Sequence, residues 1–211
     1  MDSRPATVLV IIVSAIMASA TAKDVNPQHS GTSIAEFIKS SCQVSRYPQL
    51  CVSSLSPYAG SLKPTLCDLV KAAMNVSLVN ARTVSVWAAG LKGRSAEMSE
   101  RERAALNDCI QNFDDTVDEI QKSLKELEQL QRSNFNPQMN DMQTFMSAAL
   151  TDQGSCLNGF EDVKAAAGKI SAMVKVRVQN ESELISNALA LLNALALNAF
   201  ANTGVDDGIH A

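Results

Sequence analysis

The chain has 211 residues, of which 46% are hydrophobic and only 4% aromatic, and its formal net charge is −4 at pH 7. A chain of this size can bury the core of one ordinary domain, and its many alanine and leucine residues favour close-packed helices over sheets. Because no run of lysine and arginine is present, nucleic acid is not expected as a partner.

Residues 1–22 are typical of a secretory signal peptide. Arg4 supplies the positive charge, residues 6–18 form an apolar stretch, and two A-x-A cleavage sites follow within residues 18–22. The apolar stretch is shorter than the roughly 18 residues that span a bilayer, so an uncleaved anchor or a buried helix is the weaker alternative. We therefore expect a secreted protein without a membrane segment after cleavage. A flexible leader at 23–31 and a tail at 202–211 flank its domain.

Two short helices are predicted ahead of the main domain, at residues 32–58. Ser33 followed by Glu36 is a capping box, in which each side chain accepts an amide hydrogen from the other residue at the start of a helix. A second helical piece follows Pro48, over residues 49–55. We interpret the two pieces as a helical hairpin.

Four long helices are predicted over residues 63–201, where apolar residues recur every three or four positions. Pro64 suits the first turn of the first helix, which ends near Gly90. The second helix begins at another capping box, formed by Ser99 and Glu102. Its apolar stripe is the clearest in the chain, and acidic residues crowd its other faces.

The third long helix is predicted to begin at Pro137 and to loosen at Gly154, and residues 165–169 connect it to the fourth, at 171–200. Short connections place successive helices antiparallel. The expected fold is therefore all-α, an up-down-up-down four-helix bundle preceded by the helical hairpin. The residues of the fourth helix expected to face the core are Met173, Val176, Leu184, Ala188, Leu191, Leu192 and Leu195.

Five cysteines stand at positions 42, 51, 67, 109 and 156. In an oxidising compartment pairing is the expectation, and an odd count leaves one thiol free or intermolecular. None of the five belongs to a C-x-x-C pair and no histidine lies near any of them, which disfavours a zinc site.

No catalytic constellation can be assembled from the sequence. The only histidines, His29 and His210, lie in the terminal segments, where an imidazole is not held for Ser/His/Asp or Cys/His chemistry. The acidic residues follow one helix instead of facing each other across a cleft, and no metalloprotease, nucleophile-elbow or P-loop motif is present. Methionines at helical spacing suit a core better than a metal site. We expect no enzymatic activity, cofactor or metal.

Four stretches carry a family resemblance. They are FIKSSCQVSRYPQLCVSSLSPYA around Cys42 and Cys51, AALNDCIQNFDDTVDEIQKSL around Cys109, MSAALTDQGSCLNGFEDV around Cys156, and SNALALLNAL near the end. In this order, behind a signal peptide, they resemble the plant invertase and pectin methylesterase inhibitor family over residues 32–197. The resemblance implies the same bundle with an N-terminal hairpin. It also implies disulfides Cys42–Cys51 and Cys109–Cys156, with Cys67 as the odd thiol, for which we expect a buried position.

The family has two classes of partner, pectin methylesterases and acid invertases. Its invertase inhibitors carry a Pro-Lys-Phe tripeptide on the third bundle helix, where this chain reads NFNPQMND. The resemblance therefore favours a stand-alone inhibitor of cell-wall pectin methylesterase, with acid invertase as the alternative target. Two further alternatives are a secreted structural or storage bundle without an enzyme target and a carrier of small ligands, against which the dense Leu/Ala/Met core argues.

Esterase inhibitors of the family plug the pectin-binding cleft with polar faces of their bundle helices. At three of the contact positions that the resemblance implies, this chain differs from the residue that is commoner in the family. Gln111 replaces a glutamate, Ser155 replaces a threonine and Asn158 replaces an aspartate. A cleft that accepts a polyanion should carry basic groups, so an acidic helix face suits it, and salt and acid should weaken inhibition. The simpler interpretation is that the acids only solvate an exposed helix. The contact positions implied by the resemblance are Gln111, Asp115, Asp118, Ser155 and Asn158.

Two N-glycosylation sequons begin at Asn75 and Asn180. Both lie on predicted helices, so occupancy of each is an open expectation. The sequence does not determine the oligomeric state.

Overall fold

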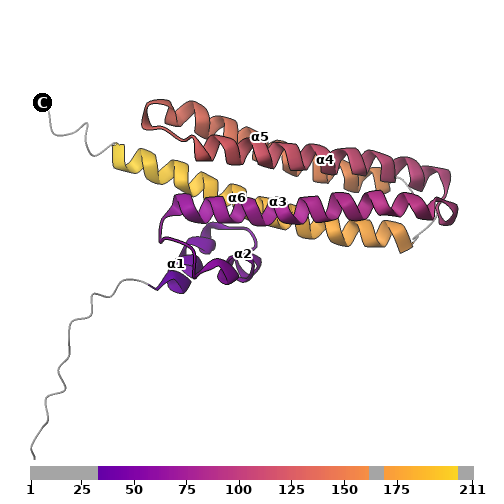
Figure 1. Cartoon of the computed structure of the whole chain (residues 1–211), viewed down its shortest axis with the longest axis horizontal. Helices are drawn as coiled ribbons and strands as arrows, with labels where there is room; N and C mark the ends of the chain where they lie inside the picture. The colour runs from indigo at the N-terminus through magenta and orange to yellow at the C-terminus, as the bar shows by residue number, and fades with distance from the viewer. Residues whose placement is uncertain (1–32, 162–168, 204–211) are drawn as a thin grey trace, which may run out of the picture. The chain divides into compact units, whose positions relative to one another are not determined.

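The computed structural model describes residues 33–161 and 169–203, with side chains up to residue 199. All regular structure in these ranges is helical, as predicted (Figure 1). The predicted signal peptide, the leader, the connection before Lys169 and most of the tail lie outside the described residues.

The N-terminal hairpin consists of two short helices. Helix α1 (Ile34–Ser41) begins at the predicted capping box, in which Ser33 Oγ accepts from the Glu36 amide and the Glu36 carboxylate accepts from the Ser33 amide. Helix α2 (Pro48–Leu55) has a proline in its first turn, where the missing amide hydrogen leaves no bond unmade. Each helix is followed by a 3₁₀ turn, η1 (Cys42–Val44) and η2 (Ser56–Tyr58).

Three features hold the hairpin together and against the bundle. A disulfide joins Cys42 to Cys51, with the two Cα atoms 5.7 Å apart. The side-chain amide of Asn187, on the last helix, makes two hydrogen bonds with the backbone of Tyr47, accepting from its amide at 3.1 Å and donating to its carbonyl at 3.0 Å. Ile38 and Leu55 bury their side chains in the same core as the bundle helices.

Four long helices form the bundle, and successive helices run antiparallel (Figure 1). Each helix packs against two others, because α3 contacts α4 and α6, and α5 contacts α4 and α6. This arrangement is the predicted four-helix bundle. The helices are α3 (Leu66–Gly90), α4 (Glu100–Glu128), α5 (Phe135–Glu161) and α6 (Lys169–Thr203). Two 3₁₀ segments connect these helices. The segment η3 (Leu91–Glu97) lies between α3 and α4, and the segment η4 (Arg132–Asn134) lies between α4 and α5.

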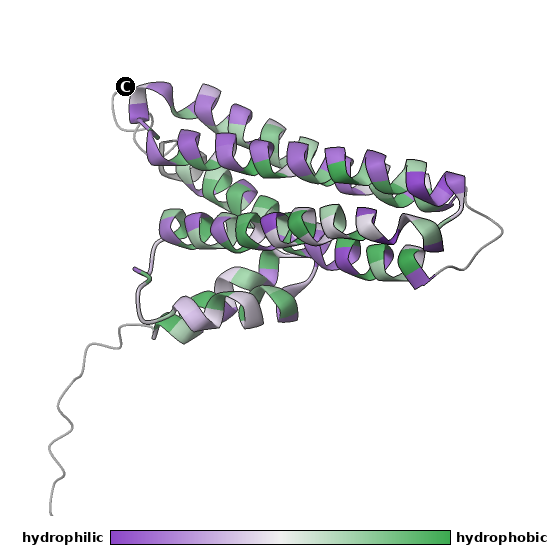
Figure 2. Cartoon of the chain, turned by 45° about the vertical axis from the view of Figure 1, so that its right-hand side comes forward, coloured by the Kyte–Doolittle hydropathy of each residue, from purple (hydrophilic) through white to green (hydrophobic). Residues whose placement is uncertain are grey.

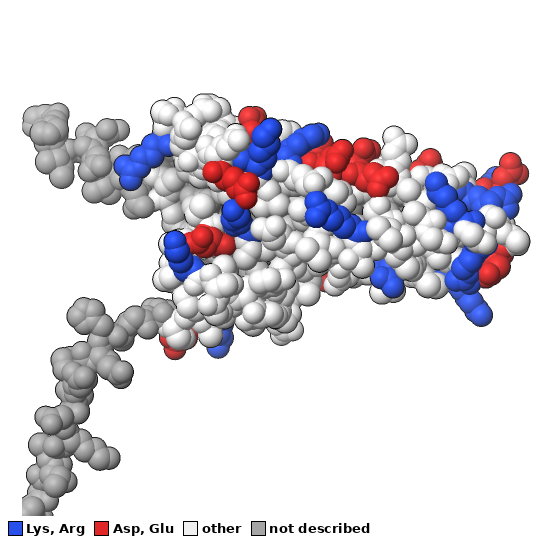
Figure 3. All heavy atoms as spheres, in the orientation of Figure 1, with Lys and Arg blue, Asp and Glu red and all other residues white. Residues whose placement is uncertain are grey.

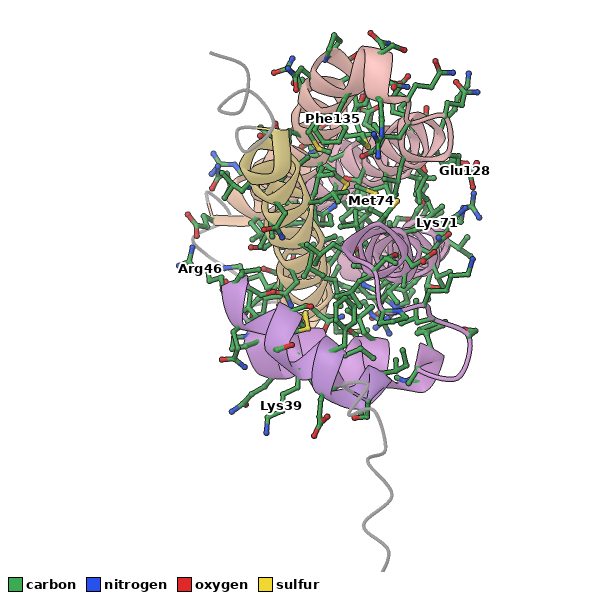
Figure 4. The ribbon with its side chains drawn as sticks, turned by 90° about the vertical axis from the view of Figure 1, so that its left-hand side faces the viewer. Lys39, Arg46, Lys71, Met74, Glu128 and Phe135 are labelled. Carbon is green, nitrogen blue, oxygen red and sulfur yellow. A yellow bond between two sulfur atoms is a disulfide. The ribbon has the colours of Figure 1, made fainter. Side chains whose placement is uncertain are left out.

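Hydrophobic residues occupy the inward sides of the helices and polar residues the outward sides (Figure 2). They form two separate clusters. One includes the hairpin residues with Leu69, Met74 and Leu191, and the other includes Phe113 and Phe160. In the end view Met74 points between the helices, whereas Lys71 and Glu128 meet at the outer surface, with Nζ and Oε1 2.8 Å apart (Figure 4).

Three predicted helix details are wrong. Helix α3 begins two residues after Pro64, at Leu66, because the Thr65 hydroxyl accepts from the Asp68 amide and is the N-cap. Helix α5 begins at Phe135 and not at Pro137, because a proline is tolerated within the first turn, and it continues without a break through Gly154. The second capping box, Ser99 with Glu102, is present as predicted.

The predicted inward face of the last helix is wrong at its N-terminal end. Met173 and Val176 are exposed, the latter by 70%, and the residues that face the core are Ile170, Val174 and Val178. These three follow a four-residue spacing, so one helical face holds them all. No helix among the described residues is both long and apolar enough to cross a membrane.

Cys67 is also not where we expected it. Its side chain lies exposed in the first turn of α3 and forms no disulfide, so the expectation of a buried position is wrong. Partial desolvation, followed by the neighbouring Asp68 carboxylate, raises the pKa of the Cys67 thiol. The thiol is therefore accessible but poorly ionised near neutral pH.

Candidate functional site

The contact between α4 and α5 is fixed at three levels along the two helices. The Cys109–Cys156 disulfide joins their buried faces, with the Cα atoms 4.5 Å apart. Further along, Gln153 Nε2 donates to Thr116 Oγ1 at 2.8 Å. These bonds hold the two helices in one register, so the residues on their outer surfaces keep fixed positions relative to each other. The third level is the Ser123 hydroxyl, which donates to the Met142 carbonyl at 3.3 Å.

The five predicted contact residues all lie exposed on these two helices. Their spacing is every three or four residues on each helix, which places them on one side of α4 and one side of α5. Both sets lie near the disulfide along the chain, because Gln111 follows Cys109 by two residues and Ser155 is next to Cys156, but they are exposed whereas the cysteines are buried. The residues are Gln111, Asp115 and Asp118 on α4, and Ser155 and Asn158 on α5.

Negative charge dominates this part of the surface. Between Arg103 and Lys122, α4 carries five acidic residues and no basic one, and α5 carries no basic residue along its whole length. A group of acidic side chains stands out over the middle of α4 (Figure 3). A surface with one sign of charge attracts groups of the opposite sign over a distance of about 10 Å at moderate salt.

Asp152 on α5 extends the acidic group across the contact between the two helices. Partial burial raises the pKa of the Asp152 carboxyl, and the nearby carboxylates of Asp115 and Glu119 raise it further. The structure therefore brings together Asp115 and Glu119 from α4 with Asp152 from α5. We define the acidic face by Gln111, Asp115, Asp118, Glu119, Asp152, Ser155 and Asn158.

Sequence reasoning did not include Glu119 and Asp152 in the face. A signal for Glu119 exists, because it lies four residues after Asp115 and shares its side of the helix. The only sequence signal for Asp152 is its position one helical turn before Cys156. That position indicates a place near the α4 acids only once the disulfide fixes the register of α5 against α4.

Lys122 limits the acidic face at one end. Its Nζ lies 2.8 Å from Glu119 Oε1 and 5.7 Å from the centre of the Phe145 ring. The hydrogen bond with Glu119, followed by the charges of Glu119 and other nearby acids, raises the pKa of Lys122. Asp114 belongs to a different contact, because it accepts a hydrogen bond from Ser85 of α3 at 2.6 Å.

The α5 side of the face is polar and nearly uncharged. The Ser155 hydroxyl donates to the Thr151 carbonyl at 3.0 Å, and the Thr151 hydroxyl donates to the Ser147 carbonyl at 3.0 Å. Their protons are used within the helix, so the lone pairs of the hydroxyl oxygens remain for an incoming donor. The face as a whole can accept hydrogen bonds and pair with cationic side chains.

Nothing in the described part of the chain supplies a nucleophile with a base or a metal site. Both histidines fall outside it, and among the described residues no group of three or more His, Cys, Asp or Glu side chains could hold a metal ion.

Asn75 and Asn180, the predicted glycosylation positions, are both exposed, on α3 and α6. Ser77, the hydroxyl residue of the first sequon, is completely buried. Glycosylation at Asn75 would therefore have to precede folding, and occupancy of both positions stays a prediction.

Comparison with known proteins identifies a matching family and similar proteins. A family model for the plant invertase/pectin methylesterase inhibitor matches residues 36–191. Pectinesterase inhibitor 9 of Arabidopsis thaliana is 34% identical over 201 residues, which cover 93% of this chain and 96% of that protein. The 21 kDa protein of Daucus carota is 34% identical over 164 residues, which cover 76% and 84%.

A solved structure shares the fold. The crystal structure of mutant form A of a pectin methylesterase inhibitor from Arabidopsis superposes with a TM-score of 0.58 at 16% identity, covering 72% of this chain and 92% of that one. Family model and relatives together span most of the chain, including both disulfides and the acidic face. The chain therefore belongs to the plant invertase/pectin methylesterase inhibitor family.

Proposed function

We propose that this protein is a secreted inhibitor that blocks the active-site cleft of a plant cell-wall pectin methylesterase and so limits pectin demethylesterification. Family membership and relatives named pectinesterase inhibitors support the class of target. The observation that carries the proposal is the acidic face, a polar surface on two helices that a disulfide holds in register, in which four of the seven defining residues are acids and Lys122 lies at one end.

Electrostatic complementarity explains how such a face would block this enzyme. A cleft that binds polyanionic pectin carries basic groups, and these would pair with Asp115, Asp118 and Asp152. Charge pairs of this kind speed association and favour the correct partner over others. Because the disulfide and the Thr116–Gln153 hydrogen bond already fix the face, little conformational freedom is lost on binding.

The inhibitor acts by occupying the cleft and needs no chemistry of its own. Relatives that the chain matches over most of its length are named pectinesterase inhibitors, which supports a function without enzymatic activity.

The direct test is inhibition of a purified plant pectin methylesterase by the disulfide-bonded chain from residue 23 onward. Asp115→Asn with Asp118→Asn removes two charges from the acidic face while keeping side-chain size. We expect the inhibition constant to rise at least about tenfold, because two charge-assisted contacts are lost.

A matched control removes two charges from the same helix outside the face. Glu100→Gln with Glu128→Gln changes exposed residues at the two ends of α4, and its inhibition constant should stay within a factor of two or so of the unsubstituted protein. Equal inhibition by both double variants would remove the acidic face from the contact. An invertase assay run in parallel tests the alternative target, and inhibition of neither enzyme would support a bundle without an enzyme target.

The pKa of Asp152 adds a pH dependence. Because that pKa is raised, Asp152 takes up a proton at a higher pH than an ordinary aspartate does. Inhibition should therefore weaken on acidification, and added salt should weaken it at every pH. An inhibition constant that is independent of salt would contradict pairing between the face and a basic cleft.

A further inference from the structure

A layer of polar side chains separates the two hydrophobic clusters of the bundle. On α4, α5 and α6 the series of buried apolar residues is interrupted between the two clusters, from Phe113 to Ile120, from Ala149 to Cys156, and from Val178 to Leu184. Each helix contributes one side chain to the gap. We call these four residues the polar layer: Asn80 of α3, Thr116 of α4, Gln153 of α5 and Glu181 of α6.

Thr116, Gln153 and Glu181 are completely buried, and Asn80 is half-buried. Their hydrogen bonds form two separate pairs. Gln153 donates to Thr116, which in turn donates to the Asn112 carbonyl at 2.8 Å, and Asn80 Nδ2 donates to Glu181 Oε2. One pair joins α4 to α5, and the other joins α3 to α6.

Each pair leaves one buried oxygen without a partner. Gln153 Oε1 and Glu181 Oε1 are both shielded from solvent and accept no hydrogen bond within the described chain. An amide oxygen and an ionised carboxylate can both accept hydrogen bonds but cannot donate them. An ionised Glu181 would therefore be a buried charge with one oxygen unpaired, which costs more free energy than burying the neutral acid.

No cation among the described residues compensates a charge on Glu181. Its pKa is raised to about 8, chiefly by burial, and the hydrogen bond from Asn80 opposes the shift. The helix α2 and the turn η1, which also pack on α6, contain no charged residue. Charged side chains of α3, α5 and α6 have other partners. Arg82 donates to Gln121, and Arg177 lies 4.4 Å from the centre of the Trp87 ring. Asp152 interacts with Asp115 and Glu119, and Glu183 accepts from Gln179.

We propose that protonation of Glu181 controls the stability of the contact between α3 and α6. The neutral acid stabilises this contact, and ionisation weakens it. Asn80 provides the route for water to this contact. It lines two open grooves on the outside of α3 and α6, one beside Pro57 and Tyr58 of the hairpin and one beside Met173 and Val176.

The direction of the effect follows from the two protonation states. In the unfolded chain Glu181 releases its proton near its ordinary pKa of 4.5, whereas in the folded protein it keeps the proton up to about 8. Its contribution to stability is therefore complete below 4.5 and is lost as the pH rises through the folded value. The protein should be more stable in acidic than in mildly alkaline surroundings.

The test is unfolding of the disulfide-bonded chain by urea across this pH range, with and without Glu181→Gln. As the pH rises from 4.5 to about 8, the folding equilibrium constant of the unsubstituted protein should fall relative to that of Glu181→Gln. The fall should be up to about tenfold per pH unit. Glu183→Gln, on the same helix but at an exposed hydrogen bond, should keep the pH dependence of the unsubstituted protein. Parallel pH curves for the unsubstituted protein and Glu181→Gln would overturn the proposal.

A second measurement keeps the proposal testable should Glu181→Gln fail to fold. Infrared difference spectroscopy of the unsubstituted protein detects the carbonyl band of a protonated carboxylic acid. The band should persist at pH values where exposed glutamates are fully ionised, and its absence there would overturn the proposal. Neither measurement involves an enzyme, so failure here is distinct from failure of the proposed function.

Discussion

The two disulfides should differ in their contributions to stability, because they close loops of different length. Cys109–Cys156 spans 47 residues and Cys42–Cys51 spans 9. In the chain-entropy model, a cross-link of the longer loop restricts the unfolded chain by about 4 kcal/mol and one of the shorter loop by about 2.5 kcal/mol. All four cysteines are buried to the same degree, so replacing them with alanine removes similar packing in both cases.

The perturbation is paired replacement with alanine, Cys109 with Cys156 or Cys42 with Cys51. Both pairs should be made in a chain that also carries Cys67→Ala, which removes the exposed thiol and with it disulfide exchange. We expect the free energy of unfolding to fall by about 4 kcal/mol for the first pair and by about 2.5 kcal/mol for the second.

Urea unfolding monitored by circular dichroism measures both free energies. Cys67→Ala alone is the control and should change the free energy little, since the side chain is exposed. The reasoning would be refuted if removing the hairpin disulfide destabilised the protein as much as removing the bundle disulfide. Such a result would mean that native contacts, and not the length of the closed loop, decide the contribution of each cross-link.

Three further outcomes are expected. Asn187→Ala should lower the free energy of unfolding by about 1–3 kcal/mol, because two partly buried hydrogen bonds to Tyr47 are lost, and urea unfolding measures it. Ser99→Ala should lower it by about 1 kcal/mol through loss of the cap on α4, measured in the same way. A maleimide should modify Cys67 in the native protein, faster as the pH rises, and mass spectrometry should find one adduct per chain.

The starts of α1 and α4 could be predicted because their causes are local, and the bundle could be predicted because short connections join successive amphipathic helices. The capping boxes at Ser33 and Ser99 each require only two residues three positions apart, and both are present. The face of α6 could not be predicted at its start, where Met173, Val174 and Val176 offer competing apolar spacings. The spacing that packs continues into Glu181, and a hydrophobic pattern does not predict a buried glutamate.

The candidate site shows the same division between local and long-range causes. Gln111, Asp115 and Asp118 share one side of α4 by helical spacing alone, so their common exposure could be predicted. The part played by Asp152 depends on the register of α5 against α4, which the disulfide and the Thr116–Gln153 bond determine. Cys67 was expected to be buried because it is a small apolar residue next to Leu66, but the buried positions of α3 begin only at Leu69 and Val70 and leave the Cys67 side chain exposed.

The proposed inhibitory surface and the proposed pH-dependent group lie at two different helix contacts of the bundle. The α4–α5 contact carries the acidic face and is held by a disulfide, so its geometry does not depend on the protonation of any side chain. The α3–α6 contact carries the buried carboxyl group of Glu181, whose protonation is proposed to control stability, and its hydrogen-bond partner Asn80 lines two open grooves. Ionisation of Glu181 would therefore lower the fraction of folded protein without altering the shape of the face in the molecules that remain folded. Under the proposed function, pH would then act on the inhibitor through two separable routes, the charge of the face and the stability of the scaffold behind it.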